Sequence, residues 1–249
     1  MPPSSIDLNA DVGEGASNDE VVLGMVTSAS VACGVHAGDI DTMRRTVEAA
    51  ARRGVVVGAH PSYPDREGFG RRPMDIPPAR VTEEVLSQVA ALDAVAKECG
   101  TRVRYVKPHG ALYLRMADDE ACARAVAAAV SDAGDLVLLA PAGTTAVAVA
   151  QSMGVTVATE AFADRAYGLD GRLAPRTVLG AVLDDPVEVT RRALRIAVDH
   201  QVTAIGGTII DLVASSICVH GDTPRAAGMA TRVRFALEGL GVTLRPFVS

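Results

Sequence analysis

Short apolar segments alternate with amphipathic helical patterns from one end of the chain to the other. The segments predicted as strands are 6–9, 30–33, 55–59, 103–106, 136–139, 155–158 and 216–219, with a closing segment at 243–247. The predicted helices are 41–53, 81–99, 118–133, 186–200 and 223–240, with a further helix ending at Met153. Two long segments, 62–78 and 160–176, lack periodicity and are predicted as loops. This alternation favours a parallel sheet with right-handed helical crossovers, as a barrel or an open sheet.

The composition agrees with such a sheet. The length of 249 residues lies between one and two average domains, but (β/α) barrels often use it as one domain. Because no repeat or linker interrupts the pattern, we expect a single domain over residues 1–249. Hydrophobic residues make up 49% of the chain, whereas aromatic residues make up 3% and Trp is absent. The core must therefore be built from Val, Ala, Leu and Ile, which suits buried parallel strands.

Charge and targeting signals exclude several functional classes. The formal net charge is −6 and no basic run occurs, so nucleic acid and anionic membrane surfaces are poor partners. The N-terminus lacks the pattern of a signal peptide, and no apolar run reaches the roughly 18 residues that span a bilayer. We expect a cytoplasmic protein. The four cysteines are dispersed, which predicts free thiols, with Cys33 and Cys218 as small hydrophobic residues at strand ends.

Polar and titratable side chains follow the C-terminal ends of the predicted strands. Four of the five histidines occupy such positions, and His200 is the exception. The residues at these ends are Asn9, Asp11, Glu14, His36, Asp39, His60, Asp65, Lys107, His109, His220 and Asp222. Because active sites of parallel α/β folds form at the C-terminal edge of the sheet, this placement predicts a functional cleft.

The segment 106–113 is the most informative of these strand ends. Lys107 is one of two lysines in a chain that is rich in arginine, so its charge is a compact, titratable ammonium group. Pro108 is expected to end the strand, because it lacks a backbone donor. Gly110 permits a turn or a close approach of the backbone to a ligand.

The residues themselves leave the chemistry open between two interpretations. Asp11 with His36 and His60 would form an oxygen-plus-two-nitrogen metal set of the kind used in hydrolytic sites. In the metal-free alternative, Lys107 and arginines hold an anion while aspartate and histidine move protons. Sequence spacing does not separate these interpretations, because the ligands come from different strands. The chain contains no G-x-S-x-G elbow, no G-x-G-x-x-G fingerprint after the first strand and no phosphate-binding loop.

The two long loops contain further candidates for anion contacts. Arg71 and Arg72 stand beside glycines in the first loop, where a carboxylate or phosphate contact competes with a solvent-facing role. The second loop carries Asp164, Arg165 and Tyr167, followed by Arg172 and Arg176 at 171–176.

Several motifs together resemble the LamB/YcsF family. They are DLNADVGE at 7–14, ACGVHAGD at 32–39, GAHPSYPD at 58–65, KPHGALY at 107–113, FADR at 162–165 and CVHGD at 218–222. The resemblance runs in order from about residue 6 to the end. It implies a deacetylase-like (β/α) barrel, seven-stranded or irregular. It also implies ATP-dependent hydrolysis of 5-oxo-L-proline to L-glutamate, yielding ADP and phosphate, together with two other 5-oxoprolinase subunits, B and C.

The strand ends, the two long loops and the matching motifs together give a set of candidate site residues. The catalytic candidates are Asp11, His36, His60, Lys107 and His109. The candidates for substrate binding are Asn9, Glu14, Arg71, Asp164, Arg165, Tyr167, His220 and Asp222. ATP is expected as a co-substrate, while the need for a divalent metal, with Asp11, His36 and His60 as its ligands, stays open.

The sequence departs from the family pattern at two positions. Val35 stands where relatives often carry an aromatic residue, and Leu114 where they often carry asparagine. Both departures concern substrate fit rather than the titratable set. Two alternative functions remain: a stand-alone metal-dependent deacetylase or amidohydrolase, and a non-catalytic lactam-binding subunit.

Overall fold

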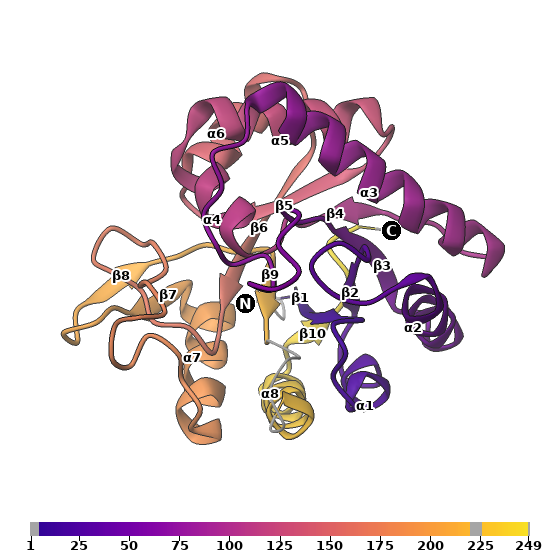
Figure 1. The fold of residues 1–249 in the computed structure, drawn as a ribbon. Coiled ribbons are helices and arrows are strands. Elements are labelled where there is room, and N and C mark those ends of the chain that lie inside the picture. The colour runs from indigo at the N-terminus through magenta and orange to yellow at the C-terminus, as the bar shows by residue number, and fades with distance from the viewer. Residues whose placement is uncertain (1–4, 220–225, 249) are drawn as a thin grey trace.

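In the computed structural model, parallel strands close into a barrel surrounded by helices (Figure 1). The structure describes residues 5–219 and 226–248. The strands of the barrel are β1 (Ser5–Val12), β2 (Ser28–Ala32), β3 (Val56–His60), β4 (Tyr105–Val106), β5 (Val137–Pro141), β6 (Val157–Phe162) and β9 (Ser216–Cys218). Strand β9 pairs with both β6 and β1, so these seven strands of the described chain form a closed ring. The predicted (β/α) barrel is therefore confirmed, and of the two forms left open it is the seven-stranded one.

Helices form the outer layer of the barrel (Figure 1). They are α1 (Asp19–Leu23), α2 (Ile40–Arg53), α3 (Pro78–Glu98), α4 (Gly110–Asp118), α5 (Glu120–Asp132), α6 (Thr145–Ser152), α7 (Pro186–Asp199) and α8 (Ala226–Gly239). Asp39 caps α2 by accepting a hydrogen bond from the Thr42 N–H at 2.8 Å, and Gly54 ends that helix at a φ of 68°. Within the described residues, no helix is long and apolar enough to cross a bilayer.

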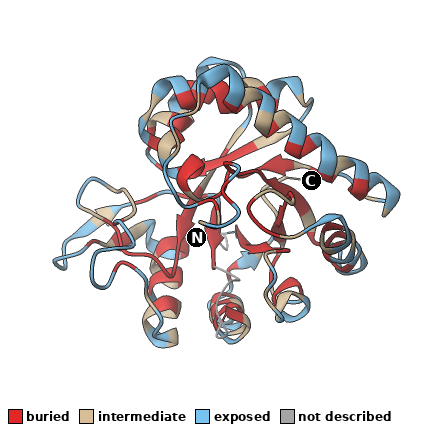
Figure 2. Cartoon of the chain, in the orientation of Figure 1, coloured by how far each residue is buried: buried red, intermediate tan, exposed pale blue. Residues whose placement is uncertain are grey.

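The core lies between the strands and the inner faces of the helices. Figure 2 shows the strands of the barrel almost entirely buried, with exposed residues on the outer faces of the helices and in the loops. Small and branched aliphatic residues dominate this core, as the composition predicts. Strand β10 (Thr243–Leu244) pairs in parallel with the start of β1, and Phe247 then packs on the Tyr105 ring at 5.0 Å between centroids.

Several elements differ from the sequence prediction. The predicted helix 118–133 is preceded by a separate helix, α4, because the Asp119 side chain caps α5 by accepting from Ala121 N and Cys122 N. Strand β6 extends to Phe162, so residues 160–162 are strand rather than loop. Helix α1 and the antiparallel pair β7 (Gln201–Thr203) and β8 (Ile209–Asp211) were not predicted, since each is too short for a clear periodic pattern.

Gly58 in β3 leaves the space that the buried ring of Tyr105 fills. The two residues are register partners on neighbouring strands, and a Cβ atom on Gly58 would lie 2.2 Å from Tyr105 Cζ. Tyr105 is fully buried, and its hydroxyl is 3.1 Å from Ser30 Oγ, so the ring has no room to move.

We expect Gly58→Ala to destabilise the fold by about 2–3 kcal/mol, because overpacking in a rigid core forces the neighbouring strand to shift. Gly228→Ala in α8 is the control, since a Cβ there meets no atom within 4 Å. It should stabilise the protein by about 0.5–1 kcal/mol through helix propensity. Urea unfolding of both variants measures the difference, and equal midpoints would contradict this account of Gly58.

Candidate active site at the C-terminal edge of the barrel

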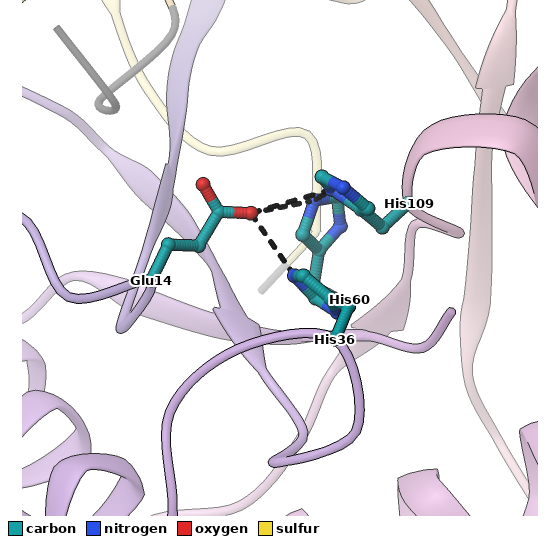
Figure 3. Close-up of side chains that lie close together, drawn as sticks. All are labelled: Glu14, His36, His60 and His109. Carbon is teal, nitrogen blue, oxygen red and sulfur yellow. Dashed lines mark hydrogen bonds and ion pairs between the residues drawn. The ribbon is translucent and has the colours of Figure 1, made fainter. Parts of the chain in front are cut away.

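Four titratable side chains converge at the C-terminal edge of strands β1 to β4. Glu14 follows β1, His36 follows β2, His60 ends β3 and His109 follows β4. Figure 3 shows the Glu14 carboxylate pointing towards the three imidazoles. One ligand atom from each residue lies within 4.8 Å of all the others. We call these four residues the Glu–His cluster.

Backbone carbonyl groups fix the tautomers of two of these histidines. His60 Nδ1 lies 2.7 Å from the Lys107 carbonyl oxygen, and His109 Nε2 lies 2.9 Å from that of Phe69. Because a carbonyl oxygen only accepts, both of these outer nitrogens carry protons. The inner nitrogens, His60 Nε2 and His109 Nδ1, are then both acceptors in the neutral rings, although they face each other at 2.9 Å. Such a contact is repulsive unless a proton or a metal cation lies between the two lone pairs.

Burial disfavours the proton. It lowers the pKa of His36 to about 3, with the neighbouring His60 adding to the effect. Burial, and then His60 and His36, also hold the pKa of His109 well below its usual range. Glu14 Oε1 lies 3.1 Å from His36 Nε2 and 3.3 Å from His109 Nδ1. The Glu–His cluster thus offers imidazole nitrogens and a carboxylate oxygen, which is the donor chemistry of hydrolytic metal sites.

The loop after β3 closes over the Glu–His cluster. Phe69 adopts a φ of 55°, a costly conformation for a bulky residue, and in it the carbonyl group meets His109 Nε2. Its ring packs edge-on against His36 and His109 at 5.5 and 5.3 Å. Asp65 holds the loop by accepting from Gly68 N and Arg72 N. Sequence reasoning missed Phe69, since a backbone carbonyl leaves no signal in residue type.

A buried ion-pair network lies beside the Glu–His cluster. Lys107 Nζ is 2.8 Å from Asp11 Oδ1 and 2.8 Å from Glu160 Oε1, and it donates to Asn9 Oδ1 at 3.3 Å. Burial alone would lower the pKa of Lys107, but Asp11 and Glu160 outweigh it and raise the pKa well above its usual range. Lys107 is therefore a permanent buried ammonium group.

Asp11 joins this network to the Glu–His cluster. Its Oδ2 atom lies 3.4 Å from His60 Nε2, while Oδ1 faces Lys107. The grouping differs from the metal set expected from the sequence, since Glu14 and His109 join His36 and His60, and Asp11 instead bridges to the lysine. Glu160 was missed because it was assigned to a loop. A charged residue inside an apolar strand was the signal that could have revealed it.

The structure divides the predicted substrate-binding residues into groups. Asn9 and Glu14 lie in the two networks described above, and the Arg71 guanidinium stacks over the Phe69 ring at 4.8 Å. Arg165 donates to the carbonyls of Ala174 and Ala181, and so anchors its own loop.

Of the remaining candidates, Tyr167 accepts a hydrogen bond from Phe162 N at 2.7 Å, and Asp164 is buried. His220 and Asp222 lie outside the described residues. Cys33 and Cys218 are buried, and burial raises the pKa of Cys33 to about 12, in line with the small-hydrophobe role expected from the sequence.

Comparison with known proteins identifies the family. Residues 6–249 match the sequence model of the LamB/YcsF family. The chain belongs to this family. A 5-oxoprolinase subunit from Streptomyces griseus is 50% identical over 248 residues, covering 97% of this chain and 99% of that protein.

Solved structures agree on the fold of this LamB/YcsF member. The lactam utilization protein from Thermus thermophilus superimposes with a TM-score of 0.91 at 42% identity, covering 98% of this chain and all of that one. The T48 deacetylase is 14% identical with a TM-score of 0.52, covering 97% of this chain and 87% of that one, and so shares the fold alone. The deacetylase-like barrel is thus confirmed.

A hydrogen-bonded group centred on Asp7 supports the buried ion-pair network of Lys107 through Ser216 and Asn9. Thr27 and Ser28 donate to Asp7 Oδ1 at 2.6 and 2.7 Å, and Ser216 donates to Oδ2. Ser216 Oγ also accepts from the Asn9 amide at 2.6 Å. Burial raises the pKa of Asp7 to about 6, although these hydrogen bonds oppose the shift.

The raised pKa makes stability depend on pH through Asp7. The folded protein favours the neutral acid, so this contribution is complete below about pH 4 and is lost as the pH rises through about 6. We expect the stability of the wild type relative to Asp7→Asn to fall across this window by up to about 3 kcal/mol. Urea unfolding of both proteins between about pH 4.5 and 7.5, a range set around that window, measures the difference. Parallel stability curves would refute the shift.

Proposed function

We propose that this chain is the lactam-hydrolysing subunit of an ATP-dependent 5-oxoprolinase. It would convert 5-oxo-L-proline to L-glutamate, with ATP going to ADP and phosphate, in an assembly with two partner subunits, B and C. The names of the 50% identical 5-oxoprolinase subunit and the 42% identical lactam utilization protein support this substrate class. The observation that carries the proposal is the Glu–His cluster beside the buried ammonium group of Lys107.

The reaction requires activation, because the nitrogen lone pair of a lactam is delocalised into its carbonyl group. Transfer of the γ-phosphoryl group of ATP to the lactam oxygen would turn that oxygen into a better leaving group before water attacks. In ring opening, the oxygen of a first water bonds to the carbonyl carbon, the carbon–nitrogen bond breaks and the nitrogen takes up a proton, which leaves an acyl phosphate. A second water then hydrolyses the acyl phosphate to the new carboxylate and phosphate.

The side chains at the site fit these demands. When no metal ion occupies the Glu–His cluster, one of its neutral imidazoles can accept the proton of the attacking water as a general base. The Lys107 ammonium group stabilises negative charge on the reacting oxygen, since its own charge is fixed by Asp11 and Glu160. Asp11 Oδ2 lies 3.4 Å from His60 Nε2, where its negative charge would help to hold a cation beside that nitrogen. We assign the substrate carboxylate to Arg71, whose guanidinium stacks on the same Phe69 ring that contacts the imidazoles.

We also propose that Glu14, His36, His60 and His109 hold a divalent metal ion. The facing lone pairs of His60 and His109, with outer nitrogens committed to carbonyl oxygens, support this assignment. When bound, such an ion would supply Lewis-acid polarisation of the lactam carbonyl. The same cluster favours one second candidate, a metal-dependent amidohydrolase that acts alone. Activity without ATP and without partners would identify that enzyme.

The two lysines of the chain provide a matched pair of variants. We expect Lys107→Met to reduce glutamate release from 5-oxo-L-proline and ATP by about 100- to 1,000-fold in the reconstituted assembly of three subunits, because it removes a buried charge at the reacting oxygen. Lys97→Met should leave the rate unchanged, since Lys97 is exposed and pairs with Asp93 on the helix surface. Thermal unfolding of both variants separates catalytic loss from misfolding. Full activity of folded Lys107→Met would refute the role.

Metal binding is tested on the purified chain. After removal of metals and titration with Zn²⁺ or Mn²⁺, we expect about one tightly bound ion per chain, as in a site built from a single set of ligands. His60→Ala and His109→Ala should each weaken binding by about 100-fold or more. His200→Asn is the control, because His200 is exposed at the C-terminal end of α7 and is not part of the Glu–His cluster. Equal affinity in the His109→Ala and His200→Asn proteins would exclude the proposed site.

A further inference from the structure

His36 differs from the other two histidines of the Glu–His cluster in what orients its ring. The outer nitrogens of His60 and His109 donate to backbone carbonyl groups at 2.7 and 2.9 Å. His36 Nδ1 is buried and has no hydrogen-bond partner among the described residues. Its ring instead stacks on that of His109, with 4.0 Å between the centroids and 6° between the planes. Because metal-binding histidines are usually oriented through the outer nitrogen, the backbone that carries His36 has to set its position.

Arg66 holds both ends of the turn that carries His36. From the loop after β3, its Nη1 donates to the Gly34 carbonyl at 3.0 Å and its Nη2 donates to the Gly38 carbonyl at 2.7 Å. His36 is midway between these two glycines in the chain. A planar guanidinium presents its N–H groups in a fixed fork, so it can fix the separation of two carbonyl groups. The bond lengths are those of strong, charge-assisted hydrogen bonds.

The main chain of Arg66 supports a second histidine. The Phe69 N–H donates to the Arg66 carbonyl oxygen at 3.2 Å, and Phe69 adopts its left-handed conformation in that turn. The Phe69 carbonyl group is in turn the acceptor for His109 Nε2. Arg66 therefore links the supports of two imidazoles, namely the turn of His36 and the carbonyl group that orients His109.

The turn that carries His36 also contacts the turn that carries Glu14. A Cβ atom on Gly38 would lie 2.7 Å from the Gly13 carbonyl oxygen, so the two backbones are in close contact there. Glu14 directly follows Gly13, and its Oε1 atom lies 3.1 Å from His36 Nε2. A shift of the His36 turn would therefore displace two groups of the Glu–His cluster rather than one.

We propose that Arg66 is a positioning residue of the Glu–His cluster, which raises the affinity of the cluster for a divalent metal ion by holding the His36 turn against the loop of Phe69. This role rests on the proposed function, since it requires a metal ion in the cluster. The Arg66 side chain is exposed, whereas the three histidines are buried. Its positive charge by itself would repel a nearby cation, so the bridge and the charge act on metal affinity with opposite signs.

The test measures the affinity of the purified, metal-free chain for Zn²⁺ by competition with a chromophoric chelator. We expect Arg66→Ala to weaken binding by about tenfold, the lower end of the range for residues that support metal ligands. Loss of the charge alone would strengthen binding, so the sign of the change separates the bridge from electrostatics. Arg66→Lys keeps the charge without the fork, and it should weaken binding to a similar extent.

Arg52→Ala is the matched control. Arg52 is exposed in the last turn of α2, where it pairs with Glu20, and it should bind Zn²⁺ as the wild type does when replaced. Thermal unfolding shows whether each variant is folded. An Arg66→Ala affinity equal to that of Arg52→Ala, or higher, would overturn the inference, and so would wild-type affinity in Arg66→Lys.

Hydrogen exchange in the metal-free chain tests the bridge directly. The amides of Phe69 and Gly70 donate within the 65–72 loop, and we expect them to lose protection in Arg66→Ala while the barrel strands keep theirs. Unchanged protection of this loop would also overturn the inference. A wild-type chain that binds no Zn²⁺ would refute the metal site and this role together. Metal binding that depends on Arg66, without glutamate release by the assembly of three subunits, would refute the proposed 5-oxoprolinase activity alone.

Discussion

The buried ammonium group of Lys107 is the interaction on which the rest of the site depends. It neutralises carboxylates from two other strands, Asp11 of β1 and Glu160 of β6, inside a barrel where an unpaired charge costs several kcal/mol. Of those carboxylates, Asp11 lies 3.4 Å from His60 Nε2 on one side, and Glu160 accepts a hydrogen bond from Tyr113 on the other. One charge therefore sets the positions of groups on both halves of the barrel edge.

The Glu–His cluster shows how the backbone, and not only the side chains, prepares the site. Carbonyl groups of Lys107 and Phe69 determine which imidazole nitrogens face inward. The Phe69 carbonyl reaches His109 only because Phe69 adopts a left-handed conformation, which costs of order 1 kcal/mol or more. Loop contacts made by Asp65 and by Arg66, which donates to the Gly34 and Gly38 carbonyls, hold that conformation.

The alternation of apolar strands and amphipathic helices was sufficient for a parallel sheet with helical crossovers, and the resemblance to the LamB/YcsF family was needed to choose a barrel over an open sheet. The sequence was also sufficient to place His36, His60 and His109 at one edge, since parallel strands bring their C-terminal ends together. It did not show that Asp11 pairs with Lys107 while Glu14 joins the histidines. Asp11 lies at the end of β1 and Glu14 directly after it, and only three-dimensional packing decides which of the two faces the lysine. The role of Glu160 was hidden because a single charged residue ended the apolar pattern of β6 early.

Barrel closure has a consequence for how the protein is made. Asp7 in β1 bonds Ser216 in β9, a partner 209 positions later in the chain. Strand β1 also carries Asp11 and leads into Glu14, so the strand with two acids of the site lacks one of its neighbours until β9 has been synthesised. Contacts this distant in sequence form late and slow folding. A growing chain on the ribosome therefore exposes one long edge of β1, and the charged network at the barrel edge is completed among the last steps of folding.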